Sequence, residues 1–253
     1  MTTLNARGVQ VNRHAQASDD RVRDVDDIRA VLFDFHTTLV DGGDPHRWLA
    51  QAAATTGTVV PEHLDAAQFL HAVWEHADVI DPEFNRDLSP AEHRRVFDEL
   101  MDHARATQGV DIDPALADEL YRIMPEQWQP YADAVPVLRS LRDAGIRIAM
   151  ISNVGIDVRP VLADVGLAEY LDAVVLSCHV GVVKPDARIF THALEALGVT
   201  ADEALMVGDS AKADAGAAAA GIRTLLLPRT DGRVHGLEAV CRLVGVPFEP
   251  EQY

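Results

Sequence analysis

The sequence has no apolar run long enough to cross a membrane as a helix, which takes about 18 or more consecutive apolar residues. Residues 1–26 are polar and mixed in charge and lack the apolar core of a signal peptide, so we expect a flexible leader there. Cysteine is scarce as well. Cys178 and Cys241 are too few for a disulfide framework and are typical of a reducing cytoplasm. We therefore expect a cytoplasmic protein without a membrane partner.

Positive charge is also in short supply. The chain carries 22 Lys and Arg residues against 40 Asp and Glu residues, a formal net charge of −18 at pH 7. A nucleic acid would be repelled over much of such a surface, so we expect no nucleic-acid partner. A small anionic ligand would need positive groups supplied locally, by a metal ion, a lysine or the N-termini of helices.

What the sequence does contain is an alternation of strands and helices. Short apolar runs typical of buried parallel strands lie at residues 30–35, 146–151, 173–177, 204–208 and 222–227. Amphipathic stretches typical of helices accompany them at 134–144, 157–165, 186–197 and 212–220. This order predicts an α/β fold: a doubly wound, Rossmann-like parallel sheet in three layers, with sites at the carboxyl ends of the strands.

A helical insertion interrupts this alternation after the first strand. Its expected helices are 46–56, 61–79, 90–108 and 114–127. Ser89 followed by Glu92, with Pro90 at the first helical position, predicts a capping box at the start of the third helix. We therefore expect a catalytic core made of residues 27–41 and 132–253, and a helical cap made of residues 42–131.

Four polar clusters fall at or just after predicted strand ends. They are Asp34–Leu39, Ser152–Asn153, Lys184–Asp186 and Gly208–Ser210, the last with Asp214 shortly after it. Because the carboxyl ends of parallel strands meet at one edge of a sheet, a single crevice could collect all four. Each cluster also has a simpler reading, as a polar loop residue, a solvated turn lysine, or a cap of the following helix.

In their order and strand context, the four clusters resemble the four motifs of the haloacid dehalogenase superfamily. The resemblance covers residues 31–229, and the insertion resembles the helical cap that one branch of the family places between its first and second motifs. It implies that Asp34 is a nucleophile. It also implies that Thr38 and Ser152 bind a phosphoryl group with help from Asn153, and that Lys184 neutralises both the nucleophile and the phosphate.

The same resemblance implies a Mg²⁺ site. Asp34, Asp209 and the backbone carbonyl of His36 would contact the ion, and Asp214 would complete the acidic site either as a ligand or behind one. Carboxylate oxygens suit Mg²⁺ rather than a softer metal. A carboxylate that attacks phosphorus needs such cations, because two anions must approach each other. We therefore predict a Mg²⁺-dependent hydrolase that acts on a small phosphorylated metabolite, a phosphomonoester, through an aspartyl-phosphate.

The chain departs from the family pattern at His36, where phosphatases of the family usually have a second aspartate that serves as the general acid/base. Three hypotheses follow. His36 could itself be the acid/base, because imidazole can donate and accept protons near neutral pH. The protein could instead be a degenerate phosphate-binding or regulatory member, or a metal-independent dehalogenase. The intact Asp209 and Asp214 motif counts against the dehalogenase. Thr37, in place of the usual glycine, is a smaller departure.

Other polar and aromatic residues are weaker candidates. Specificity residues in the cap could include His46, Trp48, His71, Trp74, His76 and Arg86, although such side chains on helices more often serve packing or lie on the surface. Cys178 precedes His179, but adjacency alone does not create a catalytic pair, and we expect Cys178 to be a buried structural thiol.

Overall fold

A computed structural model describes residues 3–4, 10–11, 28–60, 64–109 and 112–248. The predicted leader, residues 1–26, lies outside them apart from β1 (Thr3–Leu4) and β2 (Gln10–Val11), which pair antiparallel. None of the helices in these residues is long and apolar enough to span a membrane.

The centre of the molecule is a parallel sheet of five strands in the order β5-β4-β3-β6-β7. The strands are β3 (Ala30–Phe33), β4 (Arg147–Ser152), β5 (Ala173–Leu176), β6 (Ala204–Gly208) and β7 (Arg223–Leu226). Each lies within one or two residues of a predicted run. The first strand, β3, is central and pairs with both β4 and β6, so the carboxyl ends of these three strands lie side by side.

Helices cover both faces of this sheet, because successive strand residues point to opposite sides. In β3, Val31 and Phe33 join one hydrophobic cluster, whereas Ala30 and Leu32 join another. The first cluster includes side chains of α6 (Ala134–Asp143), α7 (Arg159–Asp164) and α11 (Glu238–Leu243), and the second those of α9 (Ala187–Leu197) and α10 (Gly216–Ala219). The remaining short helices are α8 (Ser177–Val180) and the 3-10 turns Ala168–Tyr170 and Ala201–Glu203. The predicted three-layer α/β fold is confirmed.

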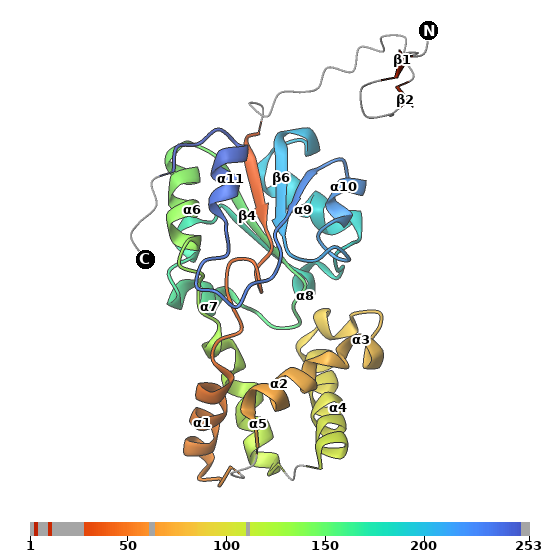
Figure 1. Cartoon of the computed structure of the whole chain (residues 1–253), viewed down its shortest axis with the longest axis vertical. Coiled ribbons are helices and arrows are strands. Elements are labelled where there is room, and N and C mark those ends of the chain that lie inside the picture. The colour runs from red at the N-terminus through yellow and green to blue at the C-terminus, as the bar shows by residue number, and fades with distance from the viewer. Residues whose placement is uncertain (1–2, 5–9, 12–27, 61–63, 110–111, 249–253) are drawn as a thin grey trace.

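The helical insertion forms a bundle at one end of the molecule (Figure 1). It contains α1 (Pro45–Thr56), α2 (Ala66–Glu75), α3 (Ala77–Ile80), α4 (Pro90–Gln108) and α5 (Pro114–Ile123), with 3-10 turns at Asn85–Asp87 and Met124–Gln127. The predicted helix 61–79 is wrong as one helix, because the chain breaks at His76 between α2 and α3; residues 61–63 lie outside the described part. The division into core and cap stays a prediction.

At the start of α4, half of the predicted capping box is present. Ser89 Oγ accepts a hydrogen bond from the backbone N–H of Glu92 at 3.3 Å. The Glu92 carboxylate pairs with Arg95, one turn along the helix. Arg95 thus holds the Glu92 side chain, which in a complete capping box would accept the backbone N–H of Ser89.

The last predicted helix, 212–220, is much shorter in the structure. The helix α10 begins only at Gly216, because the preceding turn is held by Asp214, whose carboxylate accepts the backbone N–H of Ser210 at 2.9 Å. A side chain at Gly216 would meet Pro185 at 2.4 Å, so this glycine lets α10 pack closely on the loop that follows α8. The alanine-rich sequence favours helix, but tertiary contacts override that preference.

Two connections join the insertion to the sheet, and they run next to each other. The backbone N–H of Asp41 donates to the carbonyl of Gln129 at 2.9 Å, and that of Tyr131 donates to Leu39 at 3.1 Å. Gly43 has φ 74°, and a Cβ there would lie 2.4 Å from the Gln127 carbonyl. Glycine is therefore required where the outgoing chain passes the returning one.

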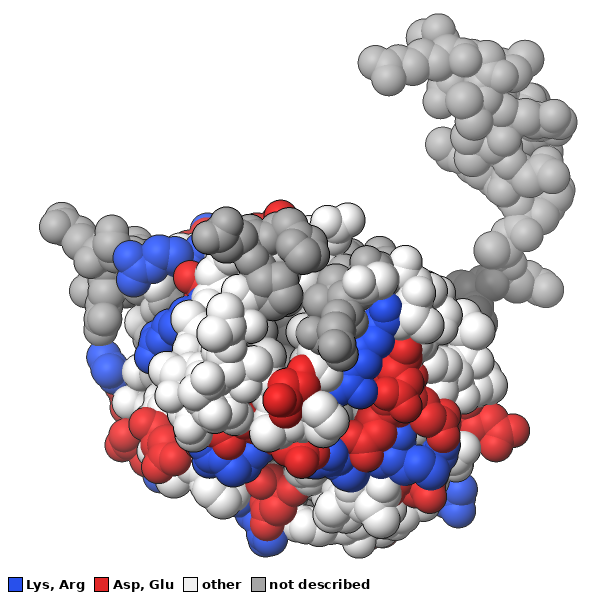
Figure 2. All heavy atoms as spheres, turned by 90° about the horizontal axis from the view of Figure 1, so that it is seen from below, with Lys and Arg blue, Asp and Glu red and all other residues white. Residues whose placement is uncertain are grey.

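The outer face of the insertion carries charges of both signs. Figure 2 shows Lys and Arg interspersed with Asp and Glu on the face seen from this end. On α4 and α5, Arg95 pairs with Glu92 and Glu99, and Arg122 pairs with Glu119 and Glu126. Exposed pairs of this kind contribute little to stability.

Candidate active site

The four predicted polar clusters come together at the carboxyl edge of the sheet. Asp34 directly follows β3, and its backbone N–H continues the ladder by donating to Val207 of β6 at 2.9 Å. Ser152 ends β4, and Asp209 directly follows β6. Hydrogen bonds link residues of all four clusters, through Asn153, Lys184, Asp34 and Asp214, whereas a nearby cavity is lined by residues of the first two clusters only.

Lys184 is the centre of this arrangement. Its Nζ donates to Asp34 Oδ1 at 2.6 Å, to Asp214 Oδ1 at 2.7 Å and to the carbonyl of Ile151 at 3.2 Å. The side chain is only 2% exposed, so the alternative of a solvated turn lysine is wrong. An ammonium group has three N–H donors, and three acceptors surround this one.

Asn153 fixes the position of Lys184 through the backbone. Its Oδ1 accepts the N–H of Lys184 at 2.7 Å, and its Nδ2 donates to the Lys184 carbonyl at 3.0 Å. These two bonds hold the backbone of Lys184 in place, although Lys184 lies in a loop. It gives Asn153 a structural task that the sequence did not indicate, beside the predicted contact with phosphate.

The pKa of Asp34 is raised to about 6 by the sum of several effects: burial raises it most, Lys184 lowers it, and the nearby Asp214 and Asp209 carboxylates raise it. Burial also disfavours the charged form of Lys184, but its two carboxylate partners prevail and raise the pKa of the lysine. In both residues, removal from water disfavours the charged form, and the ion pair between Lys184 and Asp34 favours it.

Three carboxylates form an acidic cluster. Ligand oxygens of Asp34, Asp209 and Asp214 all lie within 4.8 Å of one another. Asp214 accepts Lys184 on Oδ1 and Ser210 N–H on Oδ2, so both of its oxygens are occupied. Gly208 permits this, since a Cβ there would lie 2.2 Å from Asp214 Oδ2. Asp34 and Asp209 therefore offer oxygens to a cation more readily than Asp214, whose position favours support of the site.

The helix-cap alternatives for these residues do not fit the structure. The residue that caps α7 is Val158, six positions beyond Ser152, and Ala215 precedes α10. The carboxylate of Asp209 instead accepts a hydrogen bond from Arg229 Nε at 2.5 Å. The polar side chains at this edge therefore face one another.

The two predicted phosphate-binding hydroxyls differ in their surroundings. Thr38 is fully buried, and its Oγ1 has no hydrogen-bond partner among the described residues. An orphan buried hydroxyl is costly, and a phosphoryl oxygen would supply the missing partner. Ser152 lines the nearby cavity, which Asn153 lines as well.

His36 lies in the wall of the same cavity and is exposed to it. Its ring meets Trp128 edge-on, with centroids 5.7 Å apart. The surrounding side chains displace water from the ring and lower the pKa of His36, and the Arg229 charge lowers it further. Thr37 has φ 65°, a left-handed conformation that is strained for a β-branched residue, and its hydroxyl donates to the His36 carbonyl at 2.5 Å.

The cavity has a volume of about 380 Å³ and lies between the sheet edge and the helical insertion. Two of the candidate specificity residues line it, Trp48 and Arg86; His46 and His76 do not, and nothing is described for the side chains of His71 and Trp74. Sequence reasoning missed other lining residues, among them His93, Trp128 and Arg229. Arg229 could have been found, because it follows β7 at the same edge of the sheet; for the other two we see no sequence signal.

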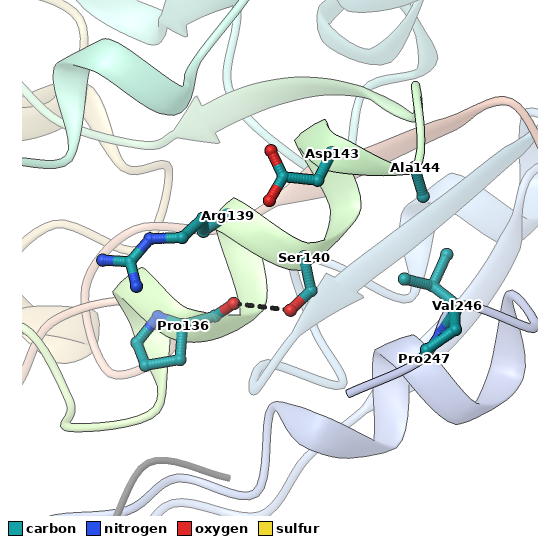
Figure 3. Close-up of a pocket in the computed structure, with 7 residues that line it drawn as sticks. All are labelled: Pro136, Arg139, Ser140, Asp143, Ala144, Val246 and Pro247. Atoms are coloured by element: carbon teal, nitrogen blue, oxygen red, sulfur yellow. Dashed lines mark hydrogen bonds between the residues drawn. The ribbon is translucent and has the colours of Figure 1, made fainter. Parts of the chain in front are cut away.

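Other features of the core lack this convergence. A hollow of about 490 Å³ lies between α6 and the segment after α11, lined by Arg139, Ser140 and Asp143 among others. Figure 3 shows that these polar side chains point in different directions, and that Ser140 bonds within its own helix. Cys178 is half-buried rather than buried as expected, and it contacts the carbonyl of Ile156 through Sγ at 3.7 Å.

Comparison with known proteins agrees with this geometry. The model of the haloacid dehalogenase-like hydrolase family matches residues 28–221. The chain belongs to this family. The predictions of the family and of a hydrolase are thereby confirmed.

Curated relatives include several phosphatases. The chain is 29% identical over 210 residues to the glyceraldehyde 3-phosphate phosphatase of Methanopyrus kandleri, a match that covers 80% of this chain and 84% of the relative. It is 35% identical over 137 residues to the phosphoserine phosphatase of Thermus thermophilus, covering 53% of this chain and 54% of the relative. The second match thus spans about half of each protein.

Solved structures of the family are similar over most of the chain. One is the phosphatase of Thermococcus onnurineus, with a TM-score of 0.59, 27% identity and coverage of 86% of this chain and 98% of that one. Another is the L-2-haloacid dehalogenase of Xanthobacter autotrophicus, with a TM-score of 0.60, 26% identity and coverage of 85% and 81%. Fold similarity alone therefore does not separate the two chemistries.

Proposed function

We propose that the protein hydrolyses a small phosphomonoester through an aspartyl-phosphate on Asp34, with Mg²⁺. The observation that carries the proposal is the buried Lys184 ammonium between Asp34 and Asp214, with Asp209 beside them. The named activities of the relatives from Methanopyrus kandleri and Thermus thermophilus support it, since both names describe phosphatases of small phosphorylated compounds.

In the proposed first step, a carboxylate oxygen of Asp34 attacks phosphorus and the bond from phosphorus to the leaving oxygen breaks. Lys184 holds Asp34 in place and offsets part of the negative charge that gathers there. The hydroxyls of Thr38 and Ser152 would bind phosphoryl oxygens. In the second step water attacks phosphorus, which frees Asp34 and releases phosphate.

The acidic cluster fits Mg²⁺. Oxygens of Asp34 and Asp209 would hold the ion with the His36 carbonyl, and these are the hard ligands that Mg²⁺ prefers. When bound, the ion would offset charge on the phosphoryl oxygens and help to orient them. Asp214 would support the site by positioning Lys184 and the Ser210 turn.

His36 is our candidate for the acid/base, because its ring lies in the wall of the cavity and senses the charge of Asp209. It would give a proton to the leaving oxygen and take one from the attacking water. Such help contributes about 10²–10⁴-fold to a rate.

The helical insertion would act as a cap that closes over the substrate. The insertion contacts the core closely at Ser177. The Oγ of this core residue donates to the carbonyl of Asp87 in the insertion at 2.5 Å and accepts the N–H of Val154 at 2.8 Å. A Cβ at Gly155 would lie 2.0 Å from the Arg86 carbonyl. A closed cap excludes water from the reacting groups.

The experiment is a panel of phosphorylated and halogenated small molecules, each tested with Mg²⁺ and with a chelator. Wild type should release phosphate only with Mg²⁺, Asp34→Asn should release none, and Asp186→Asn should match wild type. Asp186 is a suitable control, because it is an exposed helix cap two residues from Lys184 and asparagine caps equally well. An inactive wild type with an active His36→Asp variant would contradict the role of His36, and halide release without metal would contradict the phosphatase.

A further inference from the structure

Two arginines line the cavity, and their surroundings differ. Arg86 is 13% exposed, and its Nη1 donates to the carbonyl and the carboxylate of Asp81. Arg229 is 71% exposed, and the hydrogen bond that its guanidinium makes within the described residues runs from Nε to Asp209. Arg86 is thus bound into the insertion, whereas the Nη groups of Arg229 remain available at the cavity.

We propose that Arg229 binds a second anionic group of the substrate. The preferred substrate is then a phosphomonoester whose leaving alcohol joins an apolar body to a carboxylate. This inference rests on the proposed function and deepens it by naming the class of substrate.

The position of Arg229 supports this assignment. It lines the same cavity as His36 and Ser152 and pairs with Asp209, a proposed metal ligand. A divalent cation at Asp209 competes with the guanidinium for the same carboxylate and weakens its hold. Arg229 is then free to bind another anion at the cavity, which the substrate supplies. A guanidinium matches a carboxylate well, since it can donate two parallel hydrogen bonds.

Apolar side chains line the cavity as well. Phe35 and Trp128 pack edge to face, with ring centroids 5.5 Å apart. Trp48 donates its Nε1–H to the Leu120 carbonyl at 3.1 Å, which satisfies the polar end of its ring. These rings line the cavity together with Met124 and Val154. A ligand that reaches from the nucleophile to Arg229 therefore needs an apolar body beside its two anionic ends.

The test compares 4-carboxyphenyl phosphate with 4-carbamoylphenyl phosphate, two esters of nearly equal shape that differ in one negative charge. Wild type should favour the carboxylate by about 10- to 100-fold in kcat/KM, mainly through KM. Arg229→Gln should bring this preference close to 1, and Arg229→Lys should keep part of it. Arg233→Gln, an exposed arginine of the same loop, should leave the preference unchanged.

A second readout needs no turnover. Calorimetric titration with Mg²⁺ alone should give several-fold tighter binding to Arg229→Gln than to wild type, because the competing guanidinium is gone. Equal hydrolysis of the two esters by wild type, or an unchanged preference in Arg229→Gln, overturns this inference and leaves the proposed function intact. If Arg229→Gln binds Mg²⁺ no more tightly than wild type, the proposed competition between the guanidinium and the ion for Asp209 is wrong. If neither ester is hydrolysed while another phosphomonoester of the panel is, this inference fails and the proposed function stands; if no phosphomonoester is hydrolysed, both fail.

Discussion

The carboxyl edge of the sheet and the helical insertion both face the cavity, but they hold their side chains differently. At the sheet edge, Lys184 is fixed by three hydrogen bonds from its side chain and two through its backbone. The insertion contributes mainly large side chains, such as Trp48 and Met124, and one of its contacts with the core lies at Gly155 and Ser177. The sheet edge thus holds the charged groups of the proposed reaction, together with Arg229, and the insertion supplies most of the apolar wall that faces them.

The largest expected effect comes from removing the central cation of the sheet edge. Lys184→Met leaves Asp34 and Asp214 buried next to each other without it, so we expect at least about 10²–10³-fold lower kcat. We also expect about 3–5 kcal/mol lower stability in urea unfolding, since a buried charge loses its partner. The control is Lys212→Met, because Lys212 is the other lysine of the chain and is exposed above the Phe84 ring. Equal losses of kcat and of stability in Lys184→Met and Lys212→Met would contradict the central role of Lys184.

The seam between the two regions should show an intermediate effect. Ser177→Ala removes the hydroxyl that joins Asp87 and Val154, and two buried backbone groups lose a partner. We expect a stability loss of about 1–3 kcal/mol and a raised KM, because the insertion closes less firmly. Ser140→Ala, which removes a bond inside α6, should leave KM unchanged. If Ser177→Ala and Ser140→Ala have the same KM, Ser177 does not contribute to closure of the insertion over the substrate.

The last expected effect is a pH dependence that originates in the insertion and appears only at acidic pH. Burial, with help from the Arg86 charge, lowers the pKa of His93 to about 4. Between this value and the usual one near 6.5, the unfolded chain binds more protons than the folded chain, so stability falls as pH decreases through that window. From pH 7 to 5 His93 should contribute about 2 kcal/mol to the loss of stability, and His93→Gln should lack that contribution.

The comparison for this prediction is His192→Gln, at an exposed position on α9, which should keep the full pH dependence of wild type. Stability would be measured by urea unfolding at several pH values. A wild type and a His93→Gln variant with parallel curves would mean that His93 is protonated equally in both states.

The sheet edge was largely predictable from the sequence and the cavity wall was not. Strand periodicity locates Asp34, Ser152 and Asp209, because parallel strands bring their carboxyl ends together whatever the details of packing. The contribution of Trp128 depends on how the returning connection lies against Phe35, a contact distant in sequence. The hydrogen bonds that Asp214 accepts on both oxygens could not be predicted either, because they depend on a turn that interrupts a helix expected from the sequence.

Thr37 illustrates the same limit on a single residue. The sequence indicates a departure from glycine but not its conformation. The structure gives it φ 65°, the backbone that glycine adopts without strain. The turn after the nucleophile is thus set by its surroundings: the N–H of Thr37 donates to Val40 at 2.7 Å, and that of Leu39 donates to Phe35 at 2.8 Å.

The central claim is that Asp34 itself takes up the phosphoryl group, and trapping that intermediate tests it most directly. Hydroxylamine, added during turnover of an aryl phosphate, converts an aspartyl-phosphate to a hydroxamate that peptide mass spectrometry can locate. The account predicts a hydroxamate at Asp34 when substrate and Mg²⁺ are both present, and none when either is omitted. Sustained turnover with an unmodified Asp34, or a hydroxamate on another residue, would contradict it.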